Sequence, residues 1–392
     1  MAQSVRVQAG PDPYTGGKPE ALRKLGYVSL GPFPLGSGYD TRSVERLLGT
    51  EPLVWIETAH FRLGAALSAV PLKGRQEWSK EWKALVRAEL EELRHKLPNL
   101  KKRVKTLDPW LRAHLFAHRL ERLYADVLGN LGCTDESFPQ SADDPASEGF
   151  RGLGPYLGMR EKFVVLLFDK GSSQARYTKQ WQGREIAQPI RYHDQQFGCM
   201  FWSGSQETAE GLFRIDLALY AHVTFNVAHN LYTCYRSYCH DLPPWLVTGL
   251  AHWHARKVSP RFPTYDRRSD DDTDTRSVFW DWPSRVKGLV KHDVFEPLER
   301  LIDRDNAGEF GIEQHMQAWA LVDFLMATRK RQLSCFLHRL KDPFHERRKM
   351  PSRQELATRQ HDALREAFGM GPAELDVEWR AYVKESKPKR RR

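Results

Sequence analysis

The apolar segment from Leu212 to Tyr235 constrains the fold of this chain more than any other feature. Its apolar residues recur at the spacing of an α-helix, so the segment predicts one long helix. The Pro-rich stretch 241–244 then indicates a loop, and a second helix is predicted over 245–257. Three or four more helices are predicted up to about residue 384. The chain is therefore expected to be helical from residue 212 onward.

Residues 51–205 are expected to alternate strands with helices. The predicted strands are rich in β-branched and aromatic residues, and the helices between them show apolar periodicity. Residues 53–58 and 61–63 are predicted to form one or two strands, and further strands are predicted at 162–169 and 197–203. The predicted helices are 75–97, 108–128 and 172–181. The second of these helices is expected to begin at Asp108, which caps it, with Pro109 at the first helical position. Alternation of this kind indicates a mixed α/β layer, so the predicted fold class is α+β. The first 50 residues are rich in Gly and Pro and are predicted to form an extension that lies along a surface or is partly mobile.

Composition excludes several classes of protein. The 392 residues are 41% hydrophobic and 28% charged, which is an ordinary globular balance and excludes a collagen-like or wholly disordered chain. The formal net charge is +10, and five of these charges lie in a basic tail of the last six residues. The tail consists of Lys387, Lys389, Arg390, Arg391 and Arg392, with Pro388. Because no nucleic-acid-binding motif accompanies it, a solvated tail is expected and a nucleic-acid partner is not.

Several other signals are missing from the sequence. The longest apolar runs, such as 163–168, fall far short of the ~20 residues that span a bilayer, so no transmembrane segment is predicted. The first residues show no signal peptide, which predicts a cytoplasmic protein by default. Five cysteines do not indicate a disulfide framework. The absence of a glycine-rich phosphate loop and of a G-x-S-x-G motif argues against nucleotide hydrolysis and the serine-hydrolase fold.

Two short motifs lie on the predicted helix pair. The first is Phe225-Asn226-Val227-Ala228-His229, and the second is the stretch 242–251, which reads LPPWLVTGLA. Together they resemble the core of the gluzincin metallopeptidases, a branch of the zincin-fold, peptidase MA-like superfamily. In that family one helix carries His-Glu-x-x-His, and a later helix supplies a Glu within W-L-x-E-G-L-A.

Zinc chemistry explains the family's spacing. Two histidines four residues apart share one face of a helix and occupy two corners of the zinc tetrahedron. The Glu between them is the general base for the zinc-bound water. The later Glu is the third ligand, which leaves one position open for water and substrate.

The resemblance aligns only one of these four groups with a residue of the same type. His229 takes the place of the second ligand, and Thr248 that of the third, with 18 residues between them. Phe225 then stands at the first ligand position and Asn226 at the general base. Because Asn cannot take a proton from water, the resemblance implies a degenerate metallopeptidase without the family's mechanism.

A second register of the alignment is also open. It places the first ligand at His222, the base at Val223 and the second ligand at Asn226, with a gap of 21 residues to Thr248. This gap fits the family's spacing less well. Neither register gives a complete set of two histidines and two glutamates.

The resemblance extends over residues 51–384. It includes the stretches 55–62, 162–181, 318–325 and 367–382, which look like the opening strand, the elements before the metal helix, the helix behind the site and the closing helices. It implies a zincin-like fold with a small twisted sheet plus helices. The predicted segments are an irregular N-terminal extension (1–50), a zincin-like α/β subdomain that contains the former metal helices (51–256), a helical C-terminal subdomain (257–384) and the basic tail (385–392).

A rearranged metal site is the first alternative. His222, Asn226 and His229 share one face of the first helix, and His252 lies one turn after Thr248 on the second. Zinc held by His222, His229 and His252 would make the protein an active zinc hydrolase. Histidines seven residues apart are ~10.5 Å apart along a helix axis, which is long for joint ligation. We therefore expect no cofactor, with zinc as the alternative.

The expected function is binding without catalysis. The resemblance implies a cleft that takes a peptide or protein ligand, and its candidate lining residues are Trp245, His254, Trp280 and Trp282. A scaffold or nucleic-acid-associated protein that uses the basic tail is the second alternative. Many proteins of the resembling families are exported, although this chain shows no signal.

Overall fold

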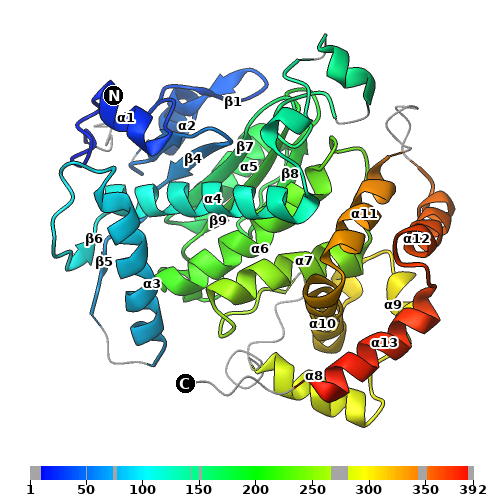
Figure 1. The fold of residues 1–392 in the computed structure, drawn as a ribbon. Helices are drawn as coiled ribbons and strands as arrows, with labels where there is room; N and C mark the ends of the chain where they lie inside the picture. The colour runs from blue at the N-terminus through cyan, green and yellow to red at the C-terminus, as the bar shows by residue number, and fades with distance from the viewer. Residues whose placement is uncertain are drawn as a thin grey trace. The chain divides into compact units, whose positions relative to one another are not determined.

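The structure, a computed structural model, combines α-helices with a mixed β-sheet (Figure 1). This confirms the expected mixture of helices and sheet. The residues that the structure describes are 10–49, 51–73, 77–141, 143–149, 152–265, 281–342 and 351–386. The chain forms two compact units. Unit 1 consists of Met1–Tyr124 and Arg160–Tyr220, and unit 2 of Ala125–Met159 and Ala221–Arg392.

This division follows packing, whereas the predicted segments follow the order of the sequence. Helix α4 (Pro109–Leu131) and helix α6 (Asp216–Cys234) each contribute residues to both units. Asp108 caps α4 as expected, because its Oδ1 accepts a hydrogen bond from the backbone N–H of Leu111 at 2.9 Å.

Unit 1 contains a five-stranded sheet with the order β3-β4-β7-β9-β8. The central strands β4, β7 and β9 run parallel, with Leu63 opposite Val165 and Val165 opposite Trp202. The outer strands β3 and β8 are antiparallel to their neighbours. The bounds are β3 Val54–Glu57, β4 Phe61–Ala65, β7 Phe163–Phe168, β8 Ile190–Asp194 and β9 Cys199–Ser205. All six residues of β7 are buried, as is typical of a central strand that is covered on both faces.

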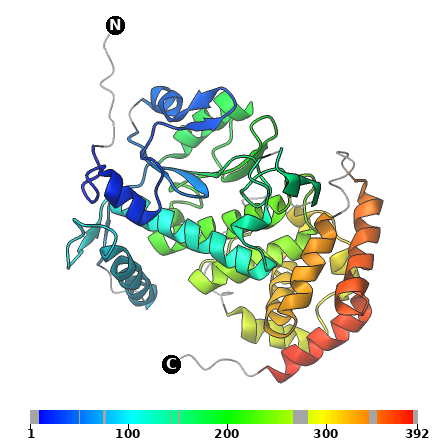
Figure 2. The ribbon, with the colours of Figure 1, turned by 45° about the horizontal axis from the view of Figure 1, so that its top comes forward.

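Helices α2 (Thr41–Leu48) and α5 (Gly171–Gln182) lie side by side in unit 1 (Figures 1 and 2). They share a hydrophobic core with the sheet. The core includes Phe33, Leu35, Val44, Leu48, Trp55, Leu166, Tyr177 and Phe201. Residues 10–49 thus contribute side chains to the core of unit 1, which differs from the expected surface extension. Hydrophobic burial explains the difference, because Leu35 and Val44 are fully removed from water.

The remaining described elements of unit 1 are short, except for α3. They are α1 Pro19–Leu25, β1 Pro34–Gly36, β2 Tyr39–Asp40, β5 Val70–Pro71, α3 Glu77–Arg94, β6 Thr106–Leu107 and the 3₁₀ turn Leu212–Arg214. The predicted helix that starts at Leu212 therefore begins with a 3₁₀ turn, and α6 itself starts at Asp216.

Unit 2 is helical in its described residues (Figure 1). Gly249 on α7 shows how closely two of its helices approach, since a Cβ at this position would lie 2.4 Å from the carbonyl oxygen of Ala318 on α10. The helices are α7 Pro244–Val258, α8 Trp282–Lys291, α9 Leu298–Ile302, α10 Ile312–Thr328, α11 Lys330–Lys341, α12 Arg353–Phe368 and α13 Pro372–Glu385. The described part of unit 2 also contains 3₁₀ turns at Asp135–Ser137, Pro145–Gly149 and Ala307–Glu309. None of the helices in the described ranges is long and apolar enough to cross a membrane.

Candidate functional site

Helices α6 and α7 carry the residues that the sequence singles out. Phe225, Asn226 and His229 lie on α6, and Thr248 and His252 lie on α7. All five side chains are buried. Both helices are apolar on most of their surface, so tertiary packing encloses the few polar groups that they carry.

Phe225, at the position aligned with the first zinc ligand, makes an apolar contact between the two helices. It is fully buried in a cluster with Ala251 and Ala255 of α7. Its ring centroid lies 4.7 Å from that of His252. An aromatic ring offers no lone pair to a metal, so this contact contributes packing rather than ligation.

Asn226, at the position aligned with the general base, bonds within its own helix. Its Nδ2 donates to the carbonyl oxygen of His222 at 3.0 Å and lies 3.3 Å from His222 Nε2. The other nitrogen of this imidazole, Nδ1, lies 3.1 Å from Oγ1 of Thr264. The Asn226 amide thus holds the ring of His222 and has no basic atom with which to accept a proton from water.

His229 and Thr248 are aligned with the second and third ligands. His229 contacts a residue of its own helix, and the hydroxyl of Thr248 makes no hydrogen bond with the described residues. Nδ1 of His229 lies 3.5 Å from Oγ1 of Thr233, one turn later on α6. Oγ1 of Thr248 is buried and has no hydrogen-bond partner among the residues that the structure describes.

His252 pairs with a residue that the sequence did not single out. Its Nε2 lies 3.0 Å from Nδ1 of His315 on α10, and both rings are fully buried. Aromatic rings surround the pair, with Trp282 at 4.8 Å from His252 and Tyr265 at 5.1 Å from His315. In this hydrogen bond one of the two nitrogens carries the hydrogen and donates it, and the other accepts it with its lone pair. Nothing in the spacing of His315 predicts this contact, because it depends on how α10 packs on α7.

The histidines of the rearranged-site hypothesis do not form a three-ligand group. Over the described ranges, no three side chains of His, Cys, Asp or Glu are grouped so that they could hold a metal ion. Of the three histidines, His222 contacts Thr264, His229 contacts Thr233 and His252 contacts His315.

The residues expected to line a cleft make internal contacts instead. Trp245 is fully buried, and its Nε1 donates to Oε1 of Gln360 at 2.7 Å. Trp282 is fully buried as well, with the guanidinium carbon of Arg256 4.2 Å above its ring. Trp280 and the basic tail 387–392 lie outside the described residues.

His254 belongs to a buried hydrogen-bond group in unit 2. Its Nε2 lies 3.1 Å from the hydroxyl of Tyr232, and Nδ2 of Asn130 donates to that hydroxyl at 2.9 Å. Burial, with a smaller effect of the Lys257 charge, lowers the pKa of His254 to about 3. The imidazole is therefore neutral at pH 7, and its Nε2 shares one hydrogen bond with the Tyr232 hydroxyl.

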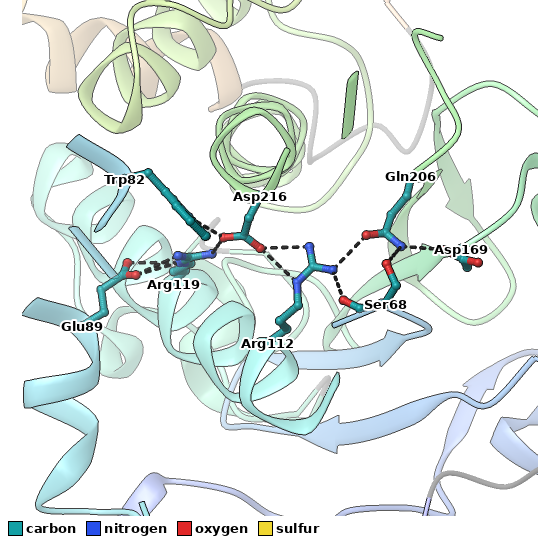
Figure 3. A network of polar contacts seen from close by, with 8 residues as sticks. All are labelled: Ser68, Trp82, Glu89, Arg112, Arg119, Asp169, Gln206 and Asp216. Carbon is teal, nitrogen blue, oxygen red and sulfur yellow. Dashed lines mark hydrogen bonds and ion pairs between the residues drawn. The ribbon is translucent and has the colours of Figure 1, made fainter. Parts of the chain in front are cut away.

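A second polar cluster lies in unit 1, at the carboxyl ends of the parallel strands (Figure 3). Ser68, Asp169 and Gln206 follow β4, β7 and β9. Nε2 of Gln206 donates to Oδ1 of Asp169 at 2.8 Å. Nη1 of Arg112 donates to Oε1 of Gln206 at 2.9 Å and to the carbonyl oxygen of Ser68 at 2.6 Å.

Two buried arginines continue this cluster toward α3 (Figure 3). Arg112 Nη2 lies 2.9 Å from Asp216 Oδ1, and Arg119 Nη1 lies 3.3 Å from Asp216 Oδ2. Arg119 Nη2 also lies 2.8 Å from Oε2 of Glu89, and Trp82 Nε1 donates to Asp216 at 3.2 Å. Two cations thus face two carboxylates, which balances the buried charge.

The charges of this cluster set the ionisation of Asp216. Burial alone would raise the pKa of its carboxyl group, but the charges of Arg112 and Arg119 outweigh burial and lower the pKa below its usual value. The cluster is closed by its own ion pairs, so we assign it a structural role. A sequence signal for it exists, because Arg112 and Arg119 are seven residues apart within a predicted apolar helix.

Comparison of the chain with protein-family models, with curated proteins and with solved structures gives no match.

Proposed function

We propose that this protein is a non-catalytic relative of the gluzincin metallopeptidases that acts by binding an extended peptide or a peptide segment of a protein. One observation carries the proposal: the positions aligned with the first zinc ligand and the general base hold buried side chains that pack against the neighbouring helix or bond within their own helix. Phe225 packs on α7, and Asn226 bonds to His222.

The chemistry of these side chains supports a loss of catalysis. General base catalysis contributes roughly 10²–10⁴-fold, and an amide cannot provide it. A catalytic zinc site needs three protein ligands, and the described residues hold no such group. If the fold is that of a metallopeptidase without catalysis, binding of a peptide is the function that remains.

Strand β8 supports the choice of an extended peptide. It lies at the end of the five-stranded sheet and pairs with β9 on one side. All five of its residues are half-buried. An edge strand can accept a further strand through main-chain hydrogen bonds, while its side chains provide selectivity.

Metal analysis and a peptidase assay test the loss of catalysis. The protein, purified without chelators and incubated with zinc, is expected to hold far less than one zinc per chain and to leave casein intact. The variant His229→Ala is expected to give the same results. Zinc near one per chain that is lost in His229→Ala, together with casein cleavage, would overturn the proposal.

Reintroducing the family's residues tests the alignment itself. The variant that combines Phe225→His, Asn226→Glu and Thr248→Glu is expected to gain zinc binding through His229, while Phe225→His alone is not. Failure of the folded triple variant to bind zinc would show that these positions do not converge as they do in gluzincins.

Peptide binding can be tested by screening a library of extended peptides by fluorescence anisotropy. A peptide that binds by strand addition is expected to lose binding when its alternate backbone nitrogens are methylated, because the N–H donors are removed while the side chains are unchanged. If the library yields no binder, or if methylated binders retain full affinity, strand addition to β8 is wrong.

A further inference from the structure

The segment that connects α3 to β6 in unit 1 is strongly basic. Residues 94–105 carry six Lys and Arg side chains and no Asp or Glu. Helix α3 ends at Arg94, and β6 begins at Thr106. Five of the six cations are exposed, namely Lys96, Lys101, Lys102, Arg103 and Lys105.

Apolar side chains and backbone contacts fix this segment to unit 1. Leu97 and Leu100 are 1% and 8% exposed, so both are packed into the protein. Between them, Nδ2 of Asn99 donates to the carbonyl oxygen of Pro13 at 3.0 Å. The leucines thus hold the backbone while the basic side chains extend into solvent.

The strand pair β5–β6 adds a further cation to the segment. β5 pairs with β6, and the backbone N–H of Leu72 donates to the carbonyl oxygen of Lys105 at 2.8 Å. The exposed residue Lys73 therefore lies beside Lys105, although the two are distant in sequence. We call the six exposed side chains the cation cluster: Lys73, Lys96, Lys101, Lys102, Arg103 and Lys105.

The charges of the cation cluster are not balanced within unit 1. None of its six side chains forms an ion pair or a hydrogen bond with the residues that the structure describes. The carboxylates at the end of α3 have other partners, since Glu91 pairs with Arg94 and Oε2 of Glu92 lies 2.9 Å from Nε2 of His118. Unbalanced like charges raise the local potential, and an anionic partner would lower it.

Helix α3 extends the row of cations (Figures 1 and 2). Nη2 of Arg94 donates to the carbonyl oxygen of Lys102 at 3.3 Å, so the face of α3 that carries Arg94 adjoins the cation cluster. Lys80 and Arg87, both exposed, share this face at intervals of seven residues. The row from Lys80 to Arg94 is ~21 Å long at 1.5 Å per residue. This length matches the rise of about six base pairs at 3.4 Å each.

We propose that the cation cluster binds the phosphodiester backbone of double-helical nucleic acid without reading its sequence. Lys and Arg side chains in a row can contact successive phosphates and release their counterions. A membrane surface is less suited, because the leucines of the segment are buried and offer no large apolar side chain for insertion. A folded acidic protein is less suited as well, because interfaces between proteins need an apolar centre. This binding does not depend on the peptide binding proposed above.

The test measures binding of the full-length protein to short fluorescent DNA and RNA duplexes of arbitrary sequence by anisotropy, over ~50–200 mM NaCl. The logarithm of the binding constant is expected to fall linearly with the logarithm of the salt concentration. The slope on DNA is expected to be about −5 if all six side chains contact phosphates, at about −0.9 for each. Absence of binding to both duplexes at the lowest salt overturns the proposal.

A triple variant tests the cation cluster. Lys101→Gln combined with Lys102→Gln and Arg103→Gln is expected to weaken binding at least tenfold at low salt and to reduce the magnitude of the slope by nearly three. The matched control combines Arg390→Gln, Arg391→Gln and Arg392→Gln, which removes the same number of charges from the basic tail. It is expected to have a smaller effect on both quantities. An equal or larger effect of the tail variant overturns the assignment to the cation cluster.

Two further probes separate the other anionic partners. Vesicles that contain phosphatidylserine test a membrane, and polyglutamate tests an acidic protein segment. The proposal is wrong if the triple variant loses vesicle binding but keeps its affinity for the duplexes, or if polyglutamate displaces the duplexes at an equal concentration of charges. If circular dichroism shows that the triple variant is not folded, Lys96→Gln with Lys105→Gln replaces it, with an expected reduction in slope of nearly two. An unchanged slope in that folded variant also overturns the proposal.

Discussion

The guanidinium group of Arg112 forms a buried ion pair with the carboxylate of Asp216, at 2.9 Å between Nη2 and Oδ1. The pair joins α4 to the first residue of α6, and Arg119 binds the second carboxylate oxygen. A charge that loses its partner inside a protein is costly, because it has given up its hydration.

The first prediction follows from this pair. Asp216→Asn keeps the size of the side chain but leaves two buried guanidinium groups facing Glu89 alone. We expect it to lower the free energy of unfolding by about 3–5 kcal/mol in urea denaturation. Glu185→Gln is the matched control, since it breaks the exposed pair with Lys179 and is expected to cost about 0–1 kcal/mol. If both variants lose similar free energy of unfolding, the buried ion pair contributes no more to stability than the exposed one.

The second prediction concerns pH. The pKa of His254 is about 3 in the folded protein against an ordinary value of 6.5, so the unfolded chain binds more protons between these values. The stability due to His254 is therefore complete above about pH 6.5 and is lost as the pH falls toward 3. Between pH 7 and pH 5 its share is about 2 kcal/mol.

Urea denaturation at both pH values measures this share. The variant His254→Gln should lose less stability on acidification than the wild-type protein, whereas His292→Gln, which changes an exposed histidine, should lose as much as wild type. An unaltered pH dependence in His254→Gln would mean that His254 is not the group responsible.

The third prediction concerns the approach of α7 and α10. In Gly249→Ala, the added methyl group would lie 2.4 Å from the carbonyl oxygen of Ala318 and 2.6 Å from a methyl carbon of Val322. We expect a loss of about 1–3 kcal/mol from overpacking. Gly288→Ala on α8 meets nothing within 4 Å and is expected to gain about 0.5–1 kcal/mol from helix propensity. Thermal denaturation of the two variants should thus show shifts of opposite sign.

The fourth prediction concerns Phe225. Because its ring is fully buried against α7, Phe225→Ala is expected to cost about 3–5 kcal/mol, and Phe225→Leu clearly less. Denaturant titration with a constant slope would measure both losses. A loss below 1 kcal/mol in Phe225→Ala would contradict the packing role given to this position.

Local patterns predicted several elements correctly. The buried strand β7, the capping of α4 by Asp108 and the helix pair α6 and α7 are features of continuous segments, in which apolar periodicity and capping residues act over a few positions. The sequence also shows directly which residues occupy the positions compared with the metallopeptidase motif, namely Phe225, Asn226 and Thr248.

The sequence alone thus determined the mixture of strands and helices, the helix pair and the identity of the side chains at positions 225, 226 and 248. Only the tertiary structure decided which buried groups meet. His252 and His315 are 63 residues apart, Arg112 and Asp216 are 104 apart, and Lys341 reaches a carbonyl oxygen 108 residues away. Such contacts follow from the packing of whole helices, because local periodicity fixes which face of a helix is buried but not which partner covers it.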